Sequence, residues 1–277
     1  MKYLILGSAG LIGSALASYL KNQGHDVIGL DIENGLGEDL RIANNDLLDK
    51  AVKECDYAFF LAFDVGGSKY LAQYEKTYDF IDNNMRIMLN VFESFKTYNT
   101  PFLFATSQMS QMTHSTYGSL KLIGEHATNV LNGRNVSFWN AYGYEKPGEK
   151  SHVIADFVHQ AVTGNTISMQ TTGVEQRQFL HVDDCSEALY QLSCQHEHIT
   201  KEEKLHITGF EWTSIMEIAQ QIAANFDNCK IVPGNRIDNV QHSIMNQPDE
   251  NILKYWQPVI DLDKGIKRTI KCYLEKY

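Results

Sequence analysis

The first twenty residues contain an apolar run, a glycine-rich turn and an amphipathic stretch, and this succession constrains the fold strongly. Residues 2–6 have the composition of a buried strand, and residues 11–22 have the spacing of a helix. Between them, Gly7, Gly10 and Gly13 form the pattern G-x-x-G-x-x-G. Such a turn brings backbone amides close to a pyrophosphate, which then lies at the positive end of the helix. The turn therefore predicts dinucleotide binding, provided that a second strand follows directly.

A second strand is predicted over residues 26–31, and it ends in Asp31. Asp31 lies 18 positions after Gly13, close to the ~20 positions expected of a carboxylate that accepts from the adenosine ribose hydroxyls. Because a carboxylate repels a 2′-phosphate, we expect the cofactor to be NAD and not NADP. The alternative is that Asp31 is a solvated strand end. The neighbouring residues expected to contact the cofactor as well are Leu11, Ile12 and Ile32.

The same first twenty residues can also be interpreted as a signal peptide. Lys2, the apolar run and the small-residue triplet at 15–17 are compatible with that interpretation. The second strand argues against it, and so do the five cysteines, which are odd in number and scattered without a C-x-x-C pair. We therefore expect no disulfide framework and no metal site, and a cytoplasmic location.

Short apolar runs alternate with longer amphipathic stretches, which is typical of a parallel sheet covered by helices on both faces. We predict an α/β fold with a Rossmann-type, doubly wound parallel sheet. The predicted strands are residues 2–6, 26–31, 57–62, 101–106 and 135–140, with shorter strands near 178–182 and 204–208. The predicted helices are residues 11–22, 79–98, 117–132, 150–163, 184–194 and 213–226.

From about residue 144 the glycines and polar residues increase, and the alternation weakens. This change indicates a smaller second lobe. We expect residues 1–143, joined by a return to the sheet over about 178–208, to form the NAD-binding domain. Residues 144–177 and 209–277 are expected to form a substrate-binding lobe.

The acidic balance of the chain limits its partners. Asp and Glu outnumber Lys and Arg by 34 to 24, which gives a formal net charge of −10. A surface of this sign repels phosphate backbones and anionic membranes, so we expect neither nucleic acid nor a membrane as a partner. A small anionic ligand is still compatible, because a helix N-terminus or a few arginines can bind it.

A tyrosine and a lysine four residues apart, Tyr117 and Lys121, fall on one face of the helix predicted over 117–132. A nearby ammonium favours the phenolate and lowers the pKa of a tyrosine from its ordinary ~10. Such a tyrosine can exchange a proton with a sugar hydroxyl while a nicotinamide carries the hydride. The pattern Y-x-x-x-K is common by itself, but in a chain with a dinucleotide-binding motif it indicates a catalytic pair.

Together these segments resemble the extended short-chain dehydrogenase/reductase family, in particular its NAD-dependent nucleotide-sugar epimerases and dehydratases. Residues 117–125, YGSLKLIGE, are similar to the family's Y-G-x-S-K-x-x-G-E, with Leu120 where serine is usual. Residues 140–143, NAYG, are similar to the family's N-x-Y-G, and residues 177–184, RQFLHVDD, to its R-D-F-x-x-V-D-D. Residues 253–258, LKYWQP, with 262–266, LDKGI, are similar to its L-G-W-x-P…L-x-x-G-I. The resemblance extends over nearly the whole chain.

The resemblance implies roles for individual residues. Ser107 would hydrogen-bond the reacting hydroxyl beside Tyr117, with Thr106 as the alternative, and Lys121 would hold the nicotinamide ribose. Further cofactor contacts that it implies are Asp46 and Leu47 at the adenine, Leu61 and Ala62 near the nicotinamide, and Tyr142. The substrate contacts that it implies are Gly67, Asn140, Arg177 and Arg236, with both arginines at the diphosphate of a nucleotide-sugar. For each arginine the alternative is an ordinary ion pair.

The residues around Ser107 narrow the expected reaction. The resemblance implies that a 4,6-dehydratase carries Asp-Glu directly after this serine and that a 3,5-epimerase carries a cysteine nearby. Here Gln108 and Met109 follow Ser107, and neither can serve as the acid or base of a dehydratase. No cysteine lies near this point, so neither reaction is expected. Nine residues separate Ser107 from Tyr117, fewer than is usual in the family, and His114 among them is an additional candidate acid or base.

We therefore expect a nucleotide-sugar 4-epimerase that oxidises and re-reduces one carbinol with NAD. Two alternatives stay open, namely a nucleotide-sugar dehydrogenase or ketoreductase with exchanging NAD(H), and a non-catalytic NAD-binding regulatory protein. The apolar positions of the helices predicted over 79–98 and 117–132, together with the resemblance, lead us to expect a homodimer with two-fold symmetry.

Overall fold

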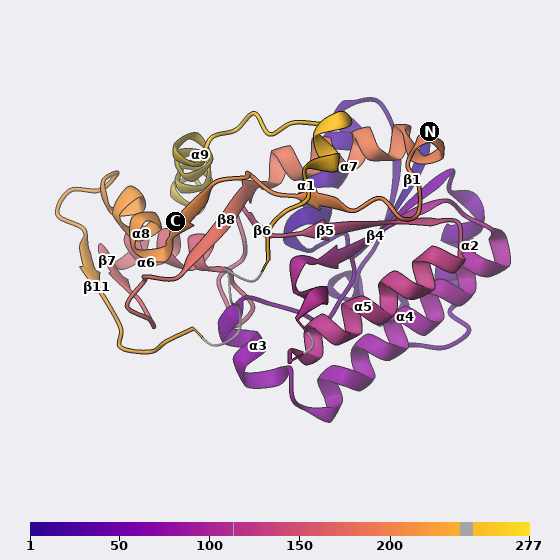
Figure 1. Ribbon diagram of the computed structural model, residues 1–277, viewed down its shortest axis with the longest axis horizontal. Coiled ribbons are helices and arrows are strands. Elements are labelled where there is room, and N and C mark those ends of the chain that lie inside the picture. The colour runs from indigo at the N-terminus through magenta and orange to yellow at the C-terminus, as the bar shows by residue number, and fades with distance from the viewer. Residues whose placement is uncertain (113, 239–245) are drawn as a thin grey trace.

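The computed structural model describes residues 1–112, 114–238 and 246–277, and within these ranges a six-stranded sheet forms the centre of the molecule (Figure 1). The strands lie in the order β2-β1-β3-β4-β5-β9, and neighbouring strands are parallel. Their bounds are β1 Lys2–Leu6, β2 Asp26–Leu30, β3 Tyr57–Phe60, β4 Phe102–Ser107, β5 Gly133–Phe138 and β9 Leu205–Ile207. This topology confirms the predicted Rossmann-type fold.

Both faces of the sheet are apolar because helices cover both. In β1, Tyr3 and Ile5 point into one hydrophobic core, and Leu4 and Leu6 point into the other. The helices of the first face are α1 (Leu11–Asn22) and α7 (Val182–Cys194), and those of the second are α2 (Asp46–Glu54), α4 (Tyr78–Tyr98) and α5 (Thr116–Val130). The result is a three-layer α/β/α arrangement.

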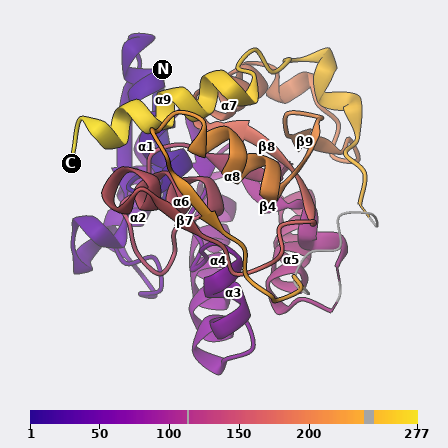
Figure 2. The same cartoon turned by 90° about the vertical axis from the view of Figure 1, so that its left-hand side faces the viewer.

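A third hydrophobic core lies beside this sheet, mostly in the C-terminal half of the chain. Within the described residues, β8 pairs with β6 and β10 in a small sheet, and β7 pairs with β11. Figure 2 shows α9 on the same side of the molecule as α6 and α8, against which it packs. The bounds are β6 Asn140–Tyr142, β7 Thr166–Ser168, β8 Gln176–His181, β10 Trp212–Ser214, β11 Lys230–Val232, α6 Val153–Gly164, α8 Ile215–Ala223 and α9 Leu262–Leu274. The division into an NAD-binding domain and a substrate-binding lobe stays a prediction.

Short helices complete the description. A seven-residue helix, α3 (Ser68–Tyr74), follows β3. The 3₁₀ segments are η1 Ile32–Asn34, η2 Leu36–Glu38, η3 Gln108–Gln111, η4 His196–His198 and η6 Glu250–Lys254. Across the part of the chain that the structure describes, no helix combines the length and the apolar composition needed to cross a membrane.

Two predicted strands differ from the structure. The strand predicted over 135–140 is two strands, because β5 ends at Phe138, where the N–H of Trp139 bonds the carbonyl of Ile207 at 3.2 Å, and β6 then pairs with β8. The return of residues 178–182 to the main sheet is wrong, since β8 lies in the small sheet. Both differences arise where the chain passes between sheets, and this passage depends on contacts between residues far apart in the sequence.

Candidate active site

A cavity of about 660 Å³ lies at the carboxyl ends of the parallel strands. Strand β1 has β2 on one side and β3 on the other, so the strand order reverses at this point. Doubly wound sheets bind their ligands at such a reversal, outside the carboxyl ends of the strands. The cavity wall is built from the segments that follow β1, β2, β3, β4 and β5.

The glycine turn between β1 and α1 forms one wall of the cavity. Gly7 has φ +89°, which residues with a side chain rarely adopt, and its N–H donates to the carbonyl of Leu30 at 2.8 Å. A Cβ on Gly13 would lie 2.0 Å from the carbonyl oxygen of Gly7, so glycine is required for α1 to start this close to β1. Gly10 precedes α1 and places no side chain over the first amides of the helix. The lining residues of this turn are Gly7, Gly10, Leu11, Ile12 and Gly13.

Asp31 follows β2 and lines the same wall, together with Ile32. Its Oδ2 accepts from the N–H of Ala9 at 2.9 Å, and its Oδ1 accepts from the N–H of Glu33 at 3.0 Å. The carboxylate thereby ties the glycine turn to the end of β2. A cradle free of Cβ atoms beside a strand-end carboxylate fits the pyrophosphate and ribose of a dinucleotide.

The two residues predicted to contact the adenine lie outside the cavity wall. Asp46 and Leu47 lie in the first turn of α2, where Leu47 is 47% exposed, and the described residues that line the cavity include neither. Asp39, Leu40 and Arg41 line it instead. The dipeptide Asp-Leu occurs at both places, and the one that lines the cavity is Asp39-Leu40 and not the predicted one. Which residues contact the adenine stays a prediction.

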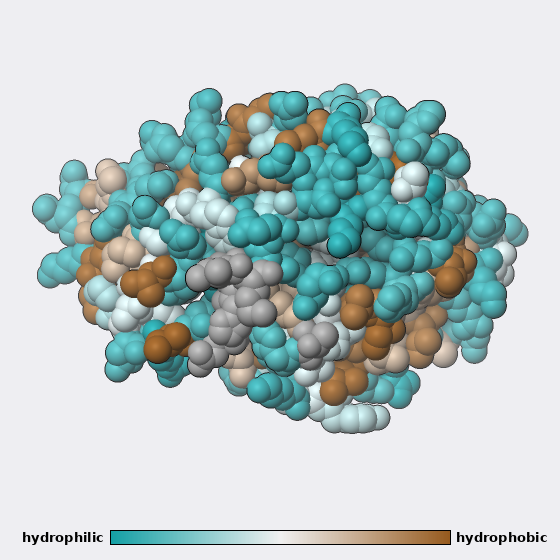
Figure 3. Space-filling model, viewed as in Figure 1, coloured by the Kyte–Doolittle hydropathy of each residue, from teal (hydrophilic) through white to brown (hydrophobic). Residues whose placement is uncertain are grey.

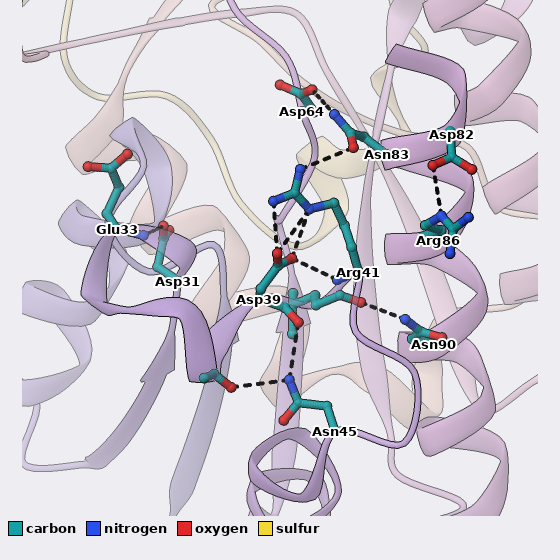
Figure 4. A network of polar contacts seen from close by, with 12 residues as sticks. Asp31, Glu33, Asp39, Arg41, Asn45, Asp64, Asp82, Asn83, Arg86 and Asn90 are labelled. Atoms are coloured by element: carbon teal, nitrogen blue, oxygen red, sulfur yellow. Dashed lines mark hydrogen bonds and ion pairs between the residues drawn. The ribbon is translucent and has the colours of Figure 1, made fainter. Parts of the chain in front are cut away.

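A polar network fixes this wall (Figure 4). Arg41 forms an ion pair with Asp39 at 2.8 Å and donates to Oδ1 of Asn83 at 3.1 Å. Asn83 in turn donates to Oδ2 of Asp64 at 2.9 Å. The guanidinium lowers the pKa of Asp39, and the carboxylate raises the pKa of Arg41, so both side chains stay charged. The network joins the segments after β2 and β3 to α4.

The predicted catalytic tyrosine and serine meet at the cavity. Tyr117 lies in the first turn of α5, Ser107 ends β4, and both line the cavity. Burial raises the pKa of Tyr117 to about 12, although the Ser107 side chain lowers it. The predicted lowering of this pKa is therefore absent in the protein alone, where the phenol is neutral.

The start of α5 fixes the position of Tyr117. Ser115 caps the helix, accepting from the N–H of Gly118 at 3.2 Å and donating to Oε2 of Glu75 at 2.7 Å. The buried carboxylate of Glu75 also accepts from the N–H of Tyr117 at 3.4 Å. A negative charge at a helix N-terminus is stabilising, so Glu75 holds this turn in place.

Lys121 lies one turn further along α5 and is buried. Its Nζ donates to the carbonyl of Ala105 at 2.6 Å and lies 3.8 Å from the centre of the Phe63 ring. Burial lowers the pKa of Lys121 to about 7, although the charge of Glu125 raises it. Both the ammonium and the amine are therefore populated near neutral pH.

The structure distinguishes Ser107 from the two other candidate catalytic residues, Thr106 and His114. The Thr106 hydroxyl donates to Oε1 of Glu125 at 2.5 Å and is engaged there. His114 is exposed, and it is not one of the described residues that line the cavity. Ser107 is thus the hydroxyl that faces Tyr117.

Gly67 and Asn140 line the cavity, as do Leu61 and Ala62. A Cβ on Gly67 would lie 2.5 Å from the carbonyl oxygen of Ser151, so this glycine permits a close approach of the two segments. The approach brings the chain before α6 to the mouth of the cavity.

Three other predicted ligand residues lie elsewhere. Tyr142 is buried in the third core, where its hydroxyl donates to the carbonyl of Leu262 at 3.4 Å. Arg177 is buried in an ion pair with Asp238, and Arg236 is exposed. None of the three is among the described lining residues. Tyr142 packs inside the third core and a carboxylate neutralises Arg177. The structure therefore lends these three contacts no support, and they stay predictions.

Among the wall residues that sequence reasoning missed are three charged ones between β6 and α6, namely Glu145, Lys150 and His152. Lys150 pairs with Asp64 at 2.7 Å, and His152 pairs with Glu145 at 2.8 Å. No motif marks this segment. It reaches the cavity through the contact at Gly67, whose N–H donates to the carbonyl of Lys150 at 3.0 Å.

Comparison with known proteins identifies the family. Residues 3–207 match the NAD dependent epimerase/dehydratase family. The chain belongs to this family. Its cofactor is NAD, and the glycine turn and Asp31 fit this group as described above.

Relatives in the epimerase/dehydratase family differ in their reactions. A UDP-glucose 4-epimerase from Mycolicibacterium smegmatis is 24% identical over 316 residues, which cover 100% of this chain and 99% of that protein. MoeE5 in complex with UDP-glucose and NAD has a TM-score of 0.83 at 19% identity, covering 100% of this chain and 99% of its own. A GDP-6-OMe-4-keto-L-xylo-heptose reductase from C. jejuni has a TM-score of 0.82 at 19% identity, covering 100% and 98%.

In this family member, Gly13→Ala is expected to weaken NAD binding by about tenfold or more, because the added Cβ would lie 2.0 Å from the Gly7 oxygen and displace the turn. Titration of cofactor-free protein with NAD measures the change. Gly164→Ala is the matched control, since a Cβ there meets no described atom within 4 Å. Equal NAD affinities of Gly13→Ala and the control would contradict the assignment of this turn.

Proposed function

We propose that the chain is an NAD-dependent nucleotide-sugar epimerase of the 4-epimerase type. The observation that carries the proposal is that Tyr117, Ser107 and Lys121 line one cavity with the glycine turn and Asp31. When bound, NAD supplies the hydride acceptor and donor. The UDP-glucose 4-epimerase from M. smegmatis, similar over its whole length, supports a nucleotide-sugar as the substrate class.

In the proposed reaction Tyr117 exchanges a proton with the sugar hydroxyl, and Ser107 holds that hydroxyl beside the phenol. Lys121, whose pKa is about 7, supplies positive charge that favours the phenolate when it is protonated. The proton returns from Tyr117 to the same oxygen after the keto sugar has turned its other face, so one set of residues serves both half-reactions. The pair Tyr117 and Lys121 argues against a non-catalytic regulatory protein, which has no use for it.

A substrate labelled with deuterium at the reacting carbon tests the proposal. With an epimerase, the deuterium returns to the same carbon, so the epimerised nucleotide-sugar keeps its label without added NAD. Mass spectrometry of the product after incubation with candidate nucleotide-sugars measures this retention. Label that accumulates in added cofactor, with net oxidation or reduction of the sugar, would establish the dehydrogenase or ketoreductase instead.

We further propose that the protein is cytoplasmic. We also propose that it acts as a homodimer whose interface is formed by α4 and α5. Leu89 on α4 is 62% exposed, and Ile123 on α5 is 49% exposed. Figure 3 shows apolar side chains gathered over these two helices. A pair of packed helices with apolar outer faces can meet its symmetry mate across a two-fold axis.

The double variant Leu89→Glu/Ile123→Glu is expected to be monomeric, because the interface would then bury four unpaired carboxylates. Light scattering after size-exclusion chromatography measures the mass, for which the wild type is expected to give twice 31.5 kDa. Val174→Glu is the control, since Val174 is 78% exposed on another segment. A monomeric wild type would contradict the homodimer.

A further inference from the structure

Glu145 and His152 form an ion pair on the cavity wall that the proposed reaction does not use. Nδ1 of His152 lies 2.8 Å from Oε1 of Glu145, and the N–H of His152 donates to Oε2 at 2.8 Å. One histidine thus engages both oxygens of the carboxylate. Glu145 is itself fixed to α9, because the buried Tyr273 hydroxyl donates to its carbonyl at 2.7 Å.

This geometry orients the imidazole of His152. With Nδ1 held by Glu145, Nε2 lies on the opposite side of the ring, and among the described residues no hydrogen bond to it is found. The side chain is 40% exposed and lines the cavity. A carboxylate behind an imidazole sets its tautomer and favours the imidazolium. Although burial opposes the charge, Glu145 raises the pKa of His152 above its ordinary value.

His152 lies beside Gly67, which is predicted to contact the substrate. A Cβ on Gly67 would lie 3.2 Å from the Cα of His152, so the two segments are in contact. The other cations of the described wall are held differently: Arg41 is bidentate on Asp39, Lys121 is buried against Ala105, and Lys150 pairs with Asp64. In His152 the Glu145 carboxylate accepts from Nδ1, so the N–H at Nε2 is left to donate to a ligand.

We propose that His152, oriented by Glu145, binds an anionic oxygen of the substrate. His152 is then a contact residue, and Glu145 is a positioning residue that acts through it. The inference rests on the proposed function, because it assigns one contact of its nucleotide-sugar. The anionic oxygen can belong to the diphosphate or to the carboxylate of a uronic acid, and the two sources are separable by experiment.

The test measures dissociation constants on the NAD-loaded protein by calorimetry. The probes are the tightest binder among UDP, GDP and dTDP, its hexose conjugate and its hexuronic acid conjugate, each at about pH 6, about pH 7 and about pH 9. The proteins are the wild type, His152→Gln, Glu145→Gln and His159→Gln. His159 lies on α6, and its ring packs on Tyr273 and Tyr277 outside the cavity, so this variant is the matched control.

The wild type and His159→Gln are expected to bind about tenfold more weakly at the highest pH than at the lowest, and His152→Gln to bind weakly at all three. Glu145→Gln is expected to lose affinity near pH 7 and to regain it at low pH, where His152 is protonated without help. A purely structural role of Glu145 would not give this recovery. An effect confined to the hexuronic acid assigns the contact to the sugar carboxylate, and an effect on all three probes assigns it to the diphosphate.

Equal affinities of the wild type and His152→Gln at all three pH values would overturn the inference and leave the proposed function intact. A wild type that binds none of the probes while it holds NAD would overturn the proposed function, and the inference with it. The two failures are therefore distinguishable in one set of titrations.

Discussion

Tyr117→Phe is expected to lower kcat by about a thousandfold, because the variant loses the group that exchanges the proton with the sugar hydroxyl. The substitution removes only the phenol hydroxyl and keeps the ring, which packs on Phe63. The variant should therefore fold and keep NAD. Initial rates with the nucleotide-sugar substrate, together with the NAD content of the purified protein, measure the effect.

Tyr255→Phe is the control for this variant. The Tyr255 hydroxyl donates to Glu203 at 2.9 Å, and Tyr255 is not one of the described residues that line the cavity. The same chemical change there should leave kcat unaltered. If Tyr117→Phe kept the activity of the control, Tyr117 would not be the proton-transfer group.

Lys121→Met is expected to abolish most of the activity and to stabilise the fold at neutral pH. An apolar side chain of similar length replaces a buried ammonium, and such replacements are often neutral or stabilising. We expect the Tm of the cofactor-free protein to rise by about 2–4 °C near pH 7. Because the charge that favours the Tyr117 phenolate is gone, kcat should fall by about a hundredfold or more.

The pKa of Lys121 also sets the direction in which the stability of the wild type changes with pH. The pKa of Lys121 is about 7 in the folded protein and 10.5 ordinarily, so between these values the unfolded chain binds more protons. The wild type should therefore gain stability as the pH rises through this window, and Lys121→Met should lack that gain. Thermal unfolding at several pH values measures the difference.

Lys150→Met is the control, because Lys150 is 55% exposed and its removal relieves no buried charge. It should not raise the Tm. A loss of stability in Lys121→Met at pH 7, as large as that of an ordinary core substitution, would show that the buried ammonium contributes favourably through its bond to Ala105.

The cofactor half of the site could be predicted because its determinants are local. Gly7, Gly10 and Gly13 lie where a strand passes into a helix, and Asp31 directly follows the next strand. Parallel strands bring their carboxyl ends to one edge, so these residues meet wherever the fold forms. Tyr117 and Lys121 are likewise one helical turn apart, and the helix fixes their common face.

The substrate half depends on contacts that the sequence does not encode locally. Arg177 meets Asp238 across 61 positions, and a pattern match cannot tell that partner from a diphosphate. Tyr142 follows Asn140 on β6, but it packs against the third core. His152 reaches the cavity through a close approach at Gly67, which a glycine in the sequence does not reveal by itself.

The predicted residues Asp46 and Leu47 lie away from the cavity for a related reason. Residues 46–47 open α2, which the sequence analysis did not predict, and its first turn is capped by Asn45. With that helix recognised, the pair at 39–40 is the one left in the loop beside the cavity. An asparagine followed by an amphipathic stretch is a helix-start signal and would have given this answer.

The most direct measurement is to denature the purified protein and identify the released small molecules by mass spectrometry. A site that recycles its hydride internally should hold NAD through purification, so we expect about one NAD per chain. A nucleotide-sugar released with it would also name the substrate. Protein that releases no cofactor, and binds added NAD weakly, would contradict the epimerase and favour a dehydrogenase or reductase.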